Sequence, residues 1–485
     1  MHTRKDIPTL FYDCLAEAHI LAVEEKLRPY ECDAYTAYKS LPLAVLLPET
    51  LEQVIKIIKR CHQENIPIVT RGAGTGLSGG AHPINNGILL NLSKLNKIHE
   101  INPDLQFARV GPGVTNLAIS EAAEEYGLYY APDPSSQIAC TIGGNIAENS
   151  GGVHCLKYGL TVHNILEITY VSYDGEIITA GSECYENFGY DILSLLNGSE
   201  GMLGIVIEAK VRLLPISHNK EVILAAFNSI EDAGHAVASI IANGVIPAGL
   251  EMMDKAIIHA TEYFCHPGYP LDAEAILLCE LDGFEDSLKW EVDRVKYECQ
   301  LANATLISRA QDKTQQDLFW KGRKAAFPAI GQLTNDYLCM DGTIPRKHLA
   351  FVLSEITRFS NEIGLGVANV FHAGDGNLHP LIMYDLNNEG ELAKAEELGG
   401  KILELCVSVG GTITGEHGVG IEKLNQMCVQ FESNELTQFE NLKLAFDPAR
   451  LLNPGKAIPT LQRCAEFGAM HVHHGKLPHP ELPRF

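Results

Sequence analysis

The sequence lacks several features that mark other classes of protein. Its 13 cysteines are odd in number and scattered, and no C-x-x-C pair occurs. We therefore expect neither an iron–sulfur nor a zinc-ribbon site, and the cysteine pattern favours a reducing cytoplasm. No run approaches the roughly 18–20 apolar residues of a membrane helix, and the amino terminus has no apolar signal region. No H-E-x-x-H helix is present, which argues against metalloproteases of that type.

Basic residues are also scarce. The chain has 37 Lys and Arg against 61 Asp and Glu, a formal net charge of −24. So acidic a protein is a poor candidate for binding nucleic acid, and an anionic substrate would need a local cationic pocket. With 485 residues, 46% of them hydrophobic, the chain is expected to form two or three packed units.

Glycine, in contrast, is concentrated in one segment, Arg71–Gly80, where five of the last nine residues are glycine. Such a loop lets backbone N–H groups crowd around an anion such as a cofactor phosphate. Gly74–Gly79 fits the G-x-G-x-x-G pattern, but turn residues and a second strand at 87–92 follow it instead of a helix. The sequence thus disfavours a Rossmann unit and predicts a loop between two strands. A glycine-rich turn without a ligand is the alternative.

Two further segments have the same small, polar character: Ala131–Gly152 and Gly198–Val206. They offer many hydrogen-bond donors and few charges, which suits walls against which a long, phosphate-bearing ligand lies. Three such segments together favour an extended cofactor such as a flavin dinucleotide.

The remaining pattern predicts an α+β protein. Thr50–Gln53 is a capping box that opens a helix, whose apolar face is Val54, Ile57, Ile58 and Cys61. Asp174-Gly175 predicts a tight hairpin, and a domain boundary is placed near 215–220. Further helices are expected at 114–126, 229–243, 286–302, 347–363 and 391–409, and further strands at 66–70, 222–227, 275–280 and 366–371.

The sharpest polar cluster is Phe371–Pro380, which contains His372 and His379. A two-residue turn at Asp375-Gly376 would pair the two histidines directly across a hairpin, with Cβ atoms ~5 Å apart. Imidazoles so placed can share a divalent metal. Two structural histidines that flank a turn are an equally good interpretation.

Two other positions carry candidate chemistry. In Gly415–Gly420, Glu416 could supply a carboxylate ligand and His417 a proton acceptor, although an exposed glycine-bounded turn is the alternative. Arg323, beside one of the two tryptophans, is the best candidate to clamp a substrate carboxylate, because its planar fork matches two oxygens. A solvated helix-face charge is the competing interpretation.

Taken together, these motifs resemble the FAD-linked oxidases of the vanillyl-alcohol oxidase / p-cresol methylhydroxylase (PCMH) type. The similarity covers nearly the whole chain and is strongest to the branch that oxidises small 2-hydroxy acids. That branch includes the FAD-binding subunits of bacterial glycolate oxidases and the D-lactate and D-2-hydroxyglutarate dehydrogenases. The segments that carry it are 69–80, 131–140, 198–204, 372–379, 415–418, 453–456 and the tail from Cys464.

The resemblance implies a fold and a cofactor. We expect a PCMH-type FAD-binding domain of two subdomains at 1–215, an α+β substrate (cap) domain with an antiparallel sheet at 216–410, and a carboxy-terminal segment, 411–485, that packs back on the FAD domain. Some relatives attach FAD covalently through a histidine in the first glycine loop. No histidine lies within 71–80, so FAD should be non-covalent here, although His82 lies just beyond the loop. The implied FAD contacts are Arg71, Gly72, Ala73, Gly74, Thr75, Gly76, Leu77, Ser78, Gly79, Pro134, Ser135, Cys140, Thr141, Gly143, Gly144, Ala147, Asn149, Gly204, Ile205 and Asn453.

The resemblance also implies a chemistry. His372, His379 and Glu416 would hold a divalent metal (Zn, Mn or Fe), His417 would be the base, and Arg323 would bind the substrate carboxylate. A lysine that relatives tend to have near Leu338 is absent here. Glycolate oxidation to glyoxylate is the leading expectation, with D-lactate or D-2-hydroxyglutarate as the alternative. Two alternatives belong to other functional classes: a non-redox flavin transferase and a non-catalytic FAD-bearing assembly subunit.

Electrons from the reduced flavin must leave the chain, which has no cluster motif of its own. The resemblance implies a second FAD-family subunit and an iron–sulfur subunit that feed the quinone pool. The location would be cytoplasmic, with the membrane reached at its inner face only through that complex. The histidine-rich run His471–His479 is expected to be an exposed or partner-contacting tail rather than a metal site.

Overall fold

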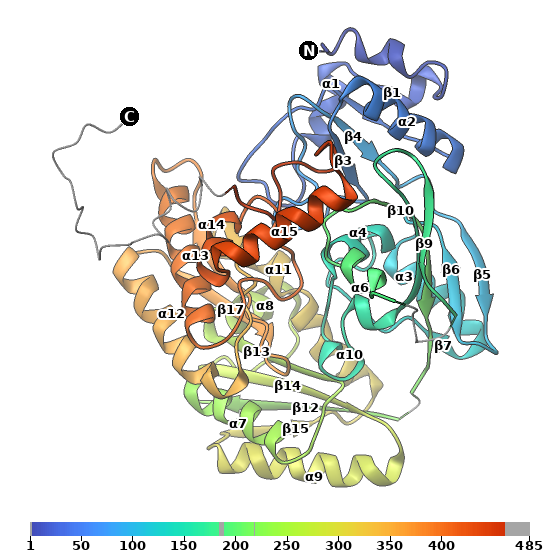
Figure 1. Ribbon diagram of the computed structural model, residues 1–485. Coiled ribbons are helices and arrows are strands. Elements are labelled where there is room, and N and C mark those ends of the chain that lie inside the picture. The colour runs from blue at the N-terminus through green and yellow to red at the C-terminus, as the bar shows by residue number, and fades with distance from the viewer. Residues whose placement is uncertain (1, 184–188, 218, 461–485) are drawn as a thin grey trace, which may run out of the picture.

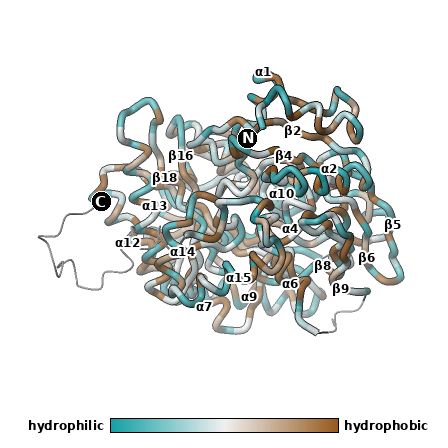
Figure 2. Tube along the Cα trace, turned by 45° about the horizontal axis from the view of Figure 1, so that its top comes forward, coloured by the Kyte–Doolittle hydropathy of each residue, from teal (hydrophilic) through white to brown (hydrophobic). Residues whose placement is uncertain are grey.

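The computed structural model describes residues 2–183, 189–217 and 219–460. Figure 1 shows a blue-to-green amino-terminal part beside a second part, yellow-green to orange, built on a large sheet, with the red helix α15 lying across both. The predicted tail at 471–479 lies outside the described residues. None of the helices in the described ranges combines the length and apolar character needed to span a bilayer. In Figure 2, hydrophilic and hydrophobic residues are interleaved along the chain.

The amino-terminal part contains two main sheets. The first has the order β1-β2-β4-β3 and is mixed. In it, β4 is parallel to both β2 and β3, whereas β1 pairs with β2 in the antiparallel sense. The second has the order β5-β6-β10-β8-β9 and is antiparallel, and a small β11-β7 pair lies beside it. The strands are β1 Ile20–Leu21, β2 Ala44–Leu46, β3 Ile68–Arg71, β4 Ile88–Asn91, β5 Ile98–Asn102, β6 Phe107–Val110, β7 Leu128–Tyr129, β8 Ile165–Val171, β9 Ile177–Gly181, β10 Ile205–Arg212 and β11 Leu214–Pro215. The helices are α1 Glu24–Leu27, α2 Leu51–Glu64, α3 Asn116–Ala123, α4 Ile142–Glu148, α5 Cys155–Tyr158 and α6 Ile192–Leu196.

Several local predictions are confirmed in this part. The α2 helix starts at the predicted capping box, since Thr50 and Gln53 bond reciprocally, and it buries the four predicted residues. The glycine segment leads from β3 to β4 without a helix between them, as the turn residues predicted. Asp174 and Gly175 lie in the hairpin between β8 and β9, where Gly175 has a φ of +86°.

The second part is built on one antiparallel sheet of seven strands in the order β15-β12-β14-β13-β17-β18-β16. Its strands are β12 Lys220–Phe227, β13 Gly249–Asp254, β14 Ala275–Asp282, β15 Leu306–Arg309, β16 Asp336–Cys339, β17 Val367–His372 and β18 Pro380–Tyr384. Its helices are α7 Ile230–Ala242, α8 Lys255–Cys265, α9 Glu285–Leu301, α10 Lys313–Lys324, α11 Ala326–Ala329, α12 Leu349–Ile363 and α13 Glu391–Ser408. The largest apolar cluster joins one face of this sheet to residues of α7, α9, α12 and α13, and another cluster joins the opposite face to α8, α10 and α11.

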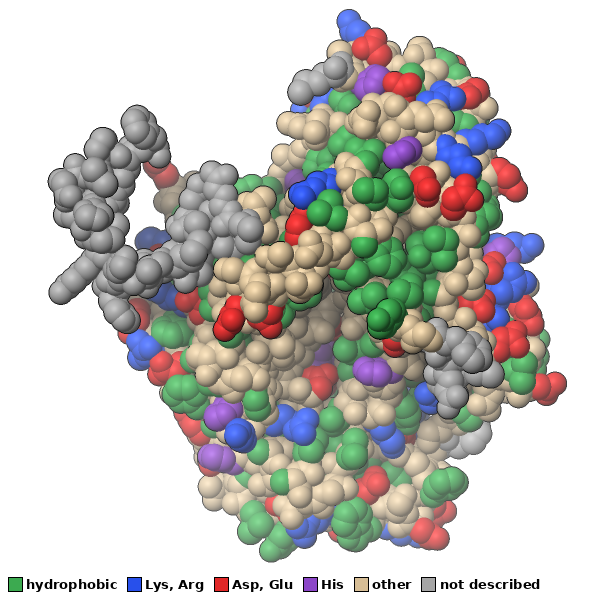
Figure 3. All heavy atoms as spheres, in the orientation of Figure 1, with side chains coloured by type: hydrophobic (Ala, Val, Ile, Leu, Met, Phe, Trp, Pro, Cys, Tyr) green, Lys and Arg blue, Asp and Glu red, His purple; other side chains and the backbone are tan. Residues whose placement is uncertain are grey.

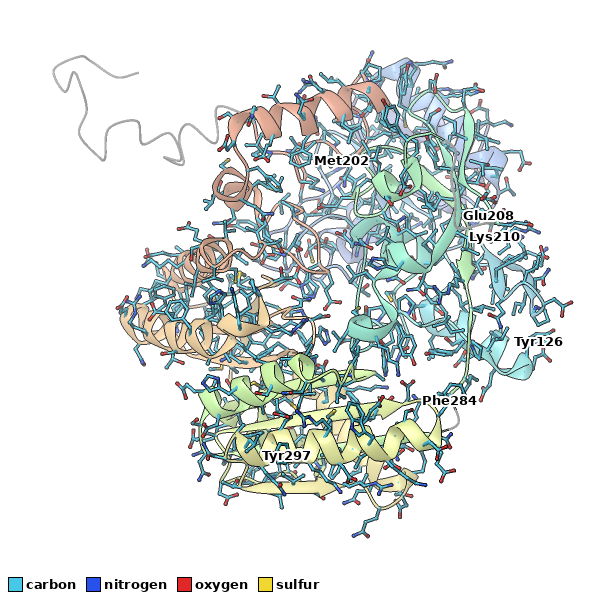
Figure 4. All side chains as sticks on the ribbon, turned by 60° about the horizontal axis from the view of Figure 1, so that its bottom comes forward. Tyr126, Met202, Glu208, Lys210, Phe284 and Tyr297 are labelled. Atoms are coloured by element: carbon cyan, nitrogen blue, oxygen red, sulfur yellow. The ribbon has the colours of Figure 1, made fainter. Side chains whose placement is uncertain are left out.

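The chain then returns to the amino-terminal part through α14 Leu424–Gln430 and α15 Ser433–Phe446. Lys443 on α15 donates to the carbonyl oxygen of Met202 at 2.7 Å, and Figure 4 places Met202 beside α15. Farther along, Ile68 at the start of β3 bridges to Leu452. The described part of 411–485 thus contacts the amino-terminal sheets, while the three domain bounds themselves stay a prediction.

Candidate active site

A cavity of about 330 Å³ is lined by all three glycine-rich segments and by residues of the second part. The predicted FAD contacts that line it are Gly72, Ala73, Gly74, Thr75, Gly76, Leu77, Pro134, Ser135, Cys140, Thr141, Gly143, Gly144, Ala147, Gly204 and Ile205. Phe327, His379, Glu416 and His417 border the same cavity. Residues far apart in sequence therefore form one continuous space, with backbone-rich walls at one end and imidazole and carboxylate groups at the other.

Two glycines explain why the first wall is so poor in side chains. A Cβ atom at Gly72 would lie 2.1 Å from Oγ1 of Thr141. At Gly74, where φ is +74°, a Cβ atom would lie 2.2 Å from Nη2 of Arg71. A backbone held this closely, in conformations that glycine tolerates, is suited to receive a long cofactor against its amides. These residues fit an FAD cradle.

Five predicted FAD contacts are not among the residues that line the cavity: Arg71, Ser78, Gly79, Asn149 and Asn453. Two of them, Arg71 and Asn453, bond to the backbone behind the wall. Arg71 donates to the carbonyl oxygen of Cys32 at 2.6 Å, and Asn453 donates to those of Gly80 and Glu200 at 2.9 and 2.6 Å. The resemblance predicted that these residues belong to the FAD-binding segments, but it could not distinguish the lining from its support.

The two buried histidines of the second part meet Glu416. Oε1 of Glu416 lies 3.1 Å from Nε2 of His372 and 3.1 Å from Nε2 of His379. The two rings have centroids 5.0 Å apart at 78° to each other. One ligand atom from each of the three residues lies within 4.8 Å of the others. Two imidazoles and one carboxylate are a donor set that suits Zn, Mn or Fe, so these residues fit a divalent metal.

The hairpin that brings the histidines together differs from the predicted one. His372 pairs with Asn377, not with His379, and a four-residue loop replaces the two-residue turn. The cause is tertiary: Ile344 donates to the carbonyl oxygen of Gly376, and Leu378 donates to that of Gly342, so a third segment fixes the loop end. The histidines still share a face, because His379 lies two residues beyond the partner of His372.

A second group of possible ligands overlaps the first, since atoms of Asp341, His379 and His417 also lie within 4.8 Å of one another. Asp341, however, already accepts hydrogen bonds from four donors of one loop: the hydroxyl of Thr414 and the backbone N–H groups of 415, 416 and 417. Lys423 lies 3.2 Å from it as well. A carboxylate has about four lone-pair sites, so Asp341 serves as the anchor of the Glu416 loop, and the first group is the better candidate for a metal site.

His417 lies against this group and opens on the cavity. Its ring stacks on that of His379, with centroids 4.9 Å apart at 15°, and its side chain is 14% exposed. Burial lowers the pKa of His417 to about 4, and the nearby Asp341 carboxylate only partly offsets this effect. A neutral imidazole at the cavity surface is the form that can accept a proton.

Arg323 does not reach the cavity in this structure. It is 1% exposed, is absent from the lining, and its Nε and Nη2 lie 2.7 and 2.6 Å from Oε2 of Glu251. The other oxygen of Glu251 lies 2.8 Å from Nδ1 of His372. The observed position therefore differs from that of a direct carboxylate clamp: Arg323 stands one layer behind the histidines, because a buried carboxylate already occupies its fork.

Comparison with known proteins agrees with this geometry. The family described as FAD binding domain matches residues 42–181, and the family described as FAD linked oxidases, C-terminal domain, matches residues 216–457. The glycolate oxidase subunit GlcD of Escherichia coli K12 is 60% identical over 96% of this chain and 93% of its own length.

This chain belongs to the FAD-linked oxidases. Other relatives are GlcD of Bacillus subtilis 168, 37% identical over 88% of this chain and 91% of its own length, and the D-lactate dehydrogenase of Archaeoglobus fulgidus, 34% identical over 88% and 96%. Among solved structures, p-cresol methylhydroxylase matches with a TM-score of 0.81 at 16% identity, covering 94% of this chain and 97% of that one. The fold is therefore of the expected PCMH type, and the protein is a flavoprotein oxidoreductase.

Sequence reasoning missed two acidic residues in the cavity of this oxidase. Glu148 and Glu200 both line it, and Glu200 accepts hydrogen bonds from the N–H groups of Val419 and Gly420, each at 2.8 Å. Burial, and next the Glu200 carboxylate, raise the pKa of Glu148 well above its usual value. Glu148 lies in the second glycine-rich segment and Glu200 in the third. An acidic residue among small, uncharged ones was the sequence feature that could have identified each.

It also missed the charges that hold the histidine end together. Glu251, Asp341 and Lys423 are each fully buried. Lys423 donates to Ser78 at 3.2 Å and to Asp341 at 3.2 Å, so it joins the glycine loop to the anchor of the Glu416 loop. An acid within the apolar run 249–254 was a usable signal for Glu251, but nothing in the sequence singles out Lys423.

Proposed function

We propose that this oxidase dehydrogenates a small 2-hydroxy acid and that glycolate, oxidised to glyoxylate, is its substrate. The observation that carries the proposal is the single cavity bordered both by the glycine-rich walls and by His379, Glu416 and His417. Support for glycolate comes from the 60% identity to a glycolate oxidase subunit over nearly the whole of both chains. D-lactate is the second candidate, because a D-lactate dehydrogenase is 34% identical.

FAD would lie along the glycine-rich walls, where it supplies a two-electron acceptor for the hydride of the substrate Cα. The cofactor would be non-covalent, since the cavity-lining part of the first glycine segment contains no histidine. His82 lies just beyond that segment, is buried and does not line the cavity, so it is a poor candidate for attachment.

The histidine end would bind and deprotonate the substrate. His372, His379 and Glu416 would hold a divalent metal, whose role as a Lewis acid is to lower the pKa of the substrate hydroxyl. His417 would take the hydroxyl proton on the ring nitrogen that faces the cavity. No lysine or arginine lines the cavity in the part of the chain that the structure describes, so the metal would also be the nearest positive charge for the substrate carboxylate.

Electron transfer out of the chain would need partners. The two GlcD relatives are named as subunits, which supports a multi-subunit assembly. We propose that a second FAD-family subunit and an iron–sulfur subunit pass electrons to the quinone pool. A cytoplasmic location, with the membrane reached only through that complex, also stays a prediction. On the face seen in Figure 3, basic side chains are interspersed with acidic ones, which gives no support to nucleic-acid binding.

Anaerobic bleaching of the flavin tests the proposal. Purified protein reconstituted with FAD is mixed with glycolate, D-lactate or D-2-hydroxyglutarate, and the loss of flavin absorbance is followed. We expect glycolate to bleach the flavin fastest. Faster bleaching by D-lactate would reassign the substrate, and no bleaching with any of the three acids would reject the dehydrogenase and favour a non-redox or assembly role.

A further inference from the structure

Glu251 is a buried carboxylate that the proposed mechanism does not use. It lies in the middle of β13, is 0% exposed, and does not line the cavity. Its neighbours on the strand, Leu250, Met252 and Met253, are apolar and buried. Leaving water is strongly unfavourable for a carboxylate unless it is paired and hydrogen-bonded. Its presence here therefore calls for a reason in its contacts.

The two oxygens of Glu251 face different partners. Oε1 lies 2.8 Å from Nδ1 of His372, and Oε2 lies within 2.7 Å of both Nε and Nη2 of Arg323. The sheet register fixes the first contact, since Glu251 and His372 are direct partners on the antiparallel strands β13 and β17. The arginine comes from the last turn of α10. A chain of buried contacts thus runs from α10 through β13 to His372.

This arrangement determines which nitrogen of His372 faces Glu251 and which faces the other proposed ligands. A carboxylate held beside an arginine is an acceptor only, so Nδ1 must be the donor to Glu251. That leaves Nε2, which lies 3.1 Å from Oε1 of Glu416 on the side of His379, as the nitrogen that would face a metal. Metal-binding histidines are commonly held in this way by a carboxylate behind them, which fixes the tautomer and the ring orientation.

We propose that Glu251 is a positioning residue that fixes the orientation of His372 so that Nε2 would face the metal, and that Arg323 holds the Glu251 carboxylate in place. The proposal rests on the proposed metal site at His372, His379 and Glu416. In this proposal Arg323 acts on Glu251 and does not itself contact the reacting atoms. A purely structural ion pair would predict a change in stability but none in metal affinity at matched folding.

The test is metal affinity in the full FAD-loaded chain. Wild type and Glu251→Gln are titrated with Co²⁺, whose visible absorption reports the ligand set, and with Zn²⁺ against a chromophoric chelator. Loss of such a supporting partner typically costs 10–100-fold in metal affinity, and we expect a loss in this range together with an altered Co²⁺ spectrum. FAD content should stay at the wild-type value.

The matched control is Glu280→Gln. Glu280 lies on the neighbouring strand β14, is 5% exposed, and is paired with His154 and Lys220, but it has no contact with the histidine pair. Its replacement should leave the Co²⁺ spectrum and affinity unchanged. If both variants lost metal equally, general destabilisation would explain the result and the positioning role would be rejected.

Glu251→Asp covers the case in which the glutamine variant does not fold. It keeps the charge beside Arg323 but withdraws it from His372, so we expect an intermediate loss of metal affinity. Wild-type affinity and spectrum in a folded Glu251 variant would overturn the proposal and leave the metal site intact. A wild-type protein that binds neither ion would instead reject the metal site itself, and this role of Glu251 with it.

Discussion

The two ends of the cavity reach their shape in different ways. At the glycine end, backbone lines the space, and the side chains that hold it, Arg71 and Asn453, lie behind and bond to carbonyl oxygens. At the histidine end, side chains line the space, and buried charges lie behind them: Asp341 accepts from the backbone N–H groups of Glu416 and His417, and Glu251 contacts the neighbouring His372. The first end should therefore be sensitive to added volume, and the second to the loss of a single charge.

Removal of the expected base should have the largest effect. His417→Ala should lower the rate of flavin bleaching by glycolate by about 10²–10⁴-fold, the usual contribution of a positioned general base. FAD affinity should not change, because the glycine end is untouched. Stopped-flow bleaching and flavin fluorescence measure the two quantities separately.

His259→Ala is the control for that variant, since this histidine is exposed and bonds only to the carbonyl oxygen of Leu271 among the described contacts. It should bleach at the wild-type rate. Normal turnover in His417→Ala would remove His417 from the mechanism and leave Glu416 or a water as the base to be tested next.

Added volume at the glycine end should act on the cofactor. In Gly74→Ala, the new Cβ meets the Arg71 guanidinium at 2.2 Å in a backbone with φ +74°. The left-handed conformation alone costs an L-residue about 1–2 kcal/mol, and the displaced loop adds to this. We expect FAD affinity to fall at least about tenfold, measured by fluorescence titration of the apoprotein.

Gly127→Ala separates strain from crowding. Gly127 has a similar φ of +69°, but a Cβ there would have nothing within 4 Å. This variant should lose a little stability and no FAD affinity. Equal FAD affinities in the two variants would show that the space in front of Arg71 does not matter for the cofactor.

The contact between the two parts offers a pH-dependent test. His154 lies between Asp133, in the second glycine-rich segment, at 2.8 Å, and Glu280, on β14 of the large sheet, at 3.3 Å. Burial lowers the pKa of His154, but the two carboxylates outweigh it and raise the pKa to about 10. Since the folded pKa lies above the unfolded value of 6.5, this stabilisation is fully present below pH 6.5 and is lost as the pH rises toward 10.

His154→Gln should therefore flatten the decline in stability between pH 6.5 and 10. The side chain is 22% exposed, so we expect a difference on the order of 2 kcal/mol, less than the full pKa shift would imply. Urea denaturation at pH 6 and pH 10 measures it. Parallel pH profiles for wild type and variant would show that His154 carries no net charge in the folded protein.

The same contrast explains what could be predicted from sequence. The glycine walls, the capping box at Thr50 and the hairpin at Asp174 depend on local composition, and each was found. The turn between His372 and His379 was wrong, because residues 342–344 pair with the loop end and override the local preference of Asp375-Gly376. The partner of Arg323 could not be foreseen, because Glu251 lies 72 residues away and only the sheet register brings it close.

Replacement of Arg323 should have the smallest effect, but it separates two roles most sharply: support of Glu251 and direct binding of the substrate carboxylate. If it acts through Glu251, Arg323→Gln should lower Co²⁺ affinity by about tenfold, because Glu251 loses a charge-assisted hydrogen bond worth roughly 1.5–3 kcal/mol. With metal in excess, the KM for glycolate should then return close to the wild-type value. A direct clamp on the substrate carboxylate predicts the reverse, a raised KM that metal does not restore and unchanged Co²⁺ binding.

Lys321→Gln, on the exposed side of the same helix turn, is the control and should change neither the Co²⁺ affinity nor the KM. The pair of measurements thus decides whether the charges at the histidine end reach the substrate or act only on the groups that bind it.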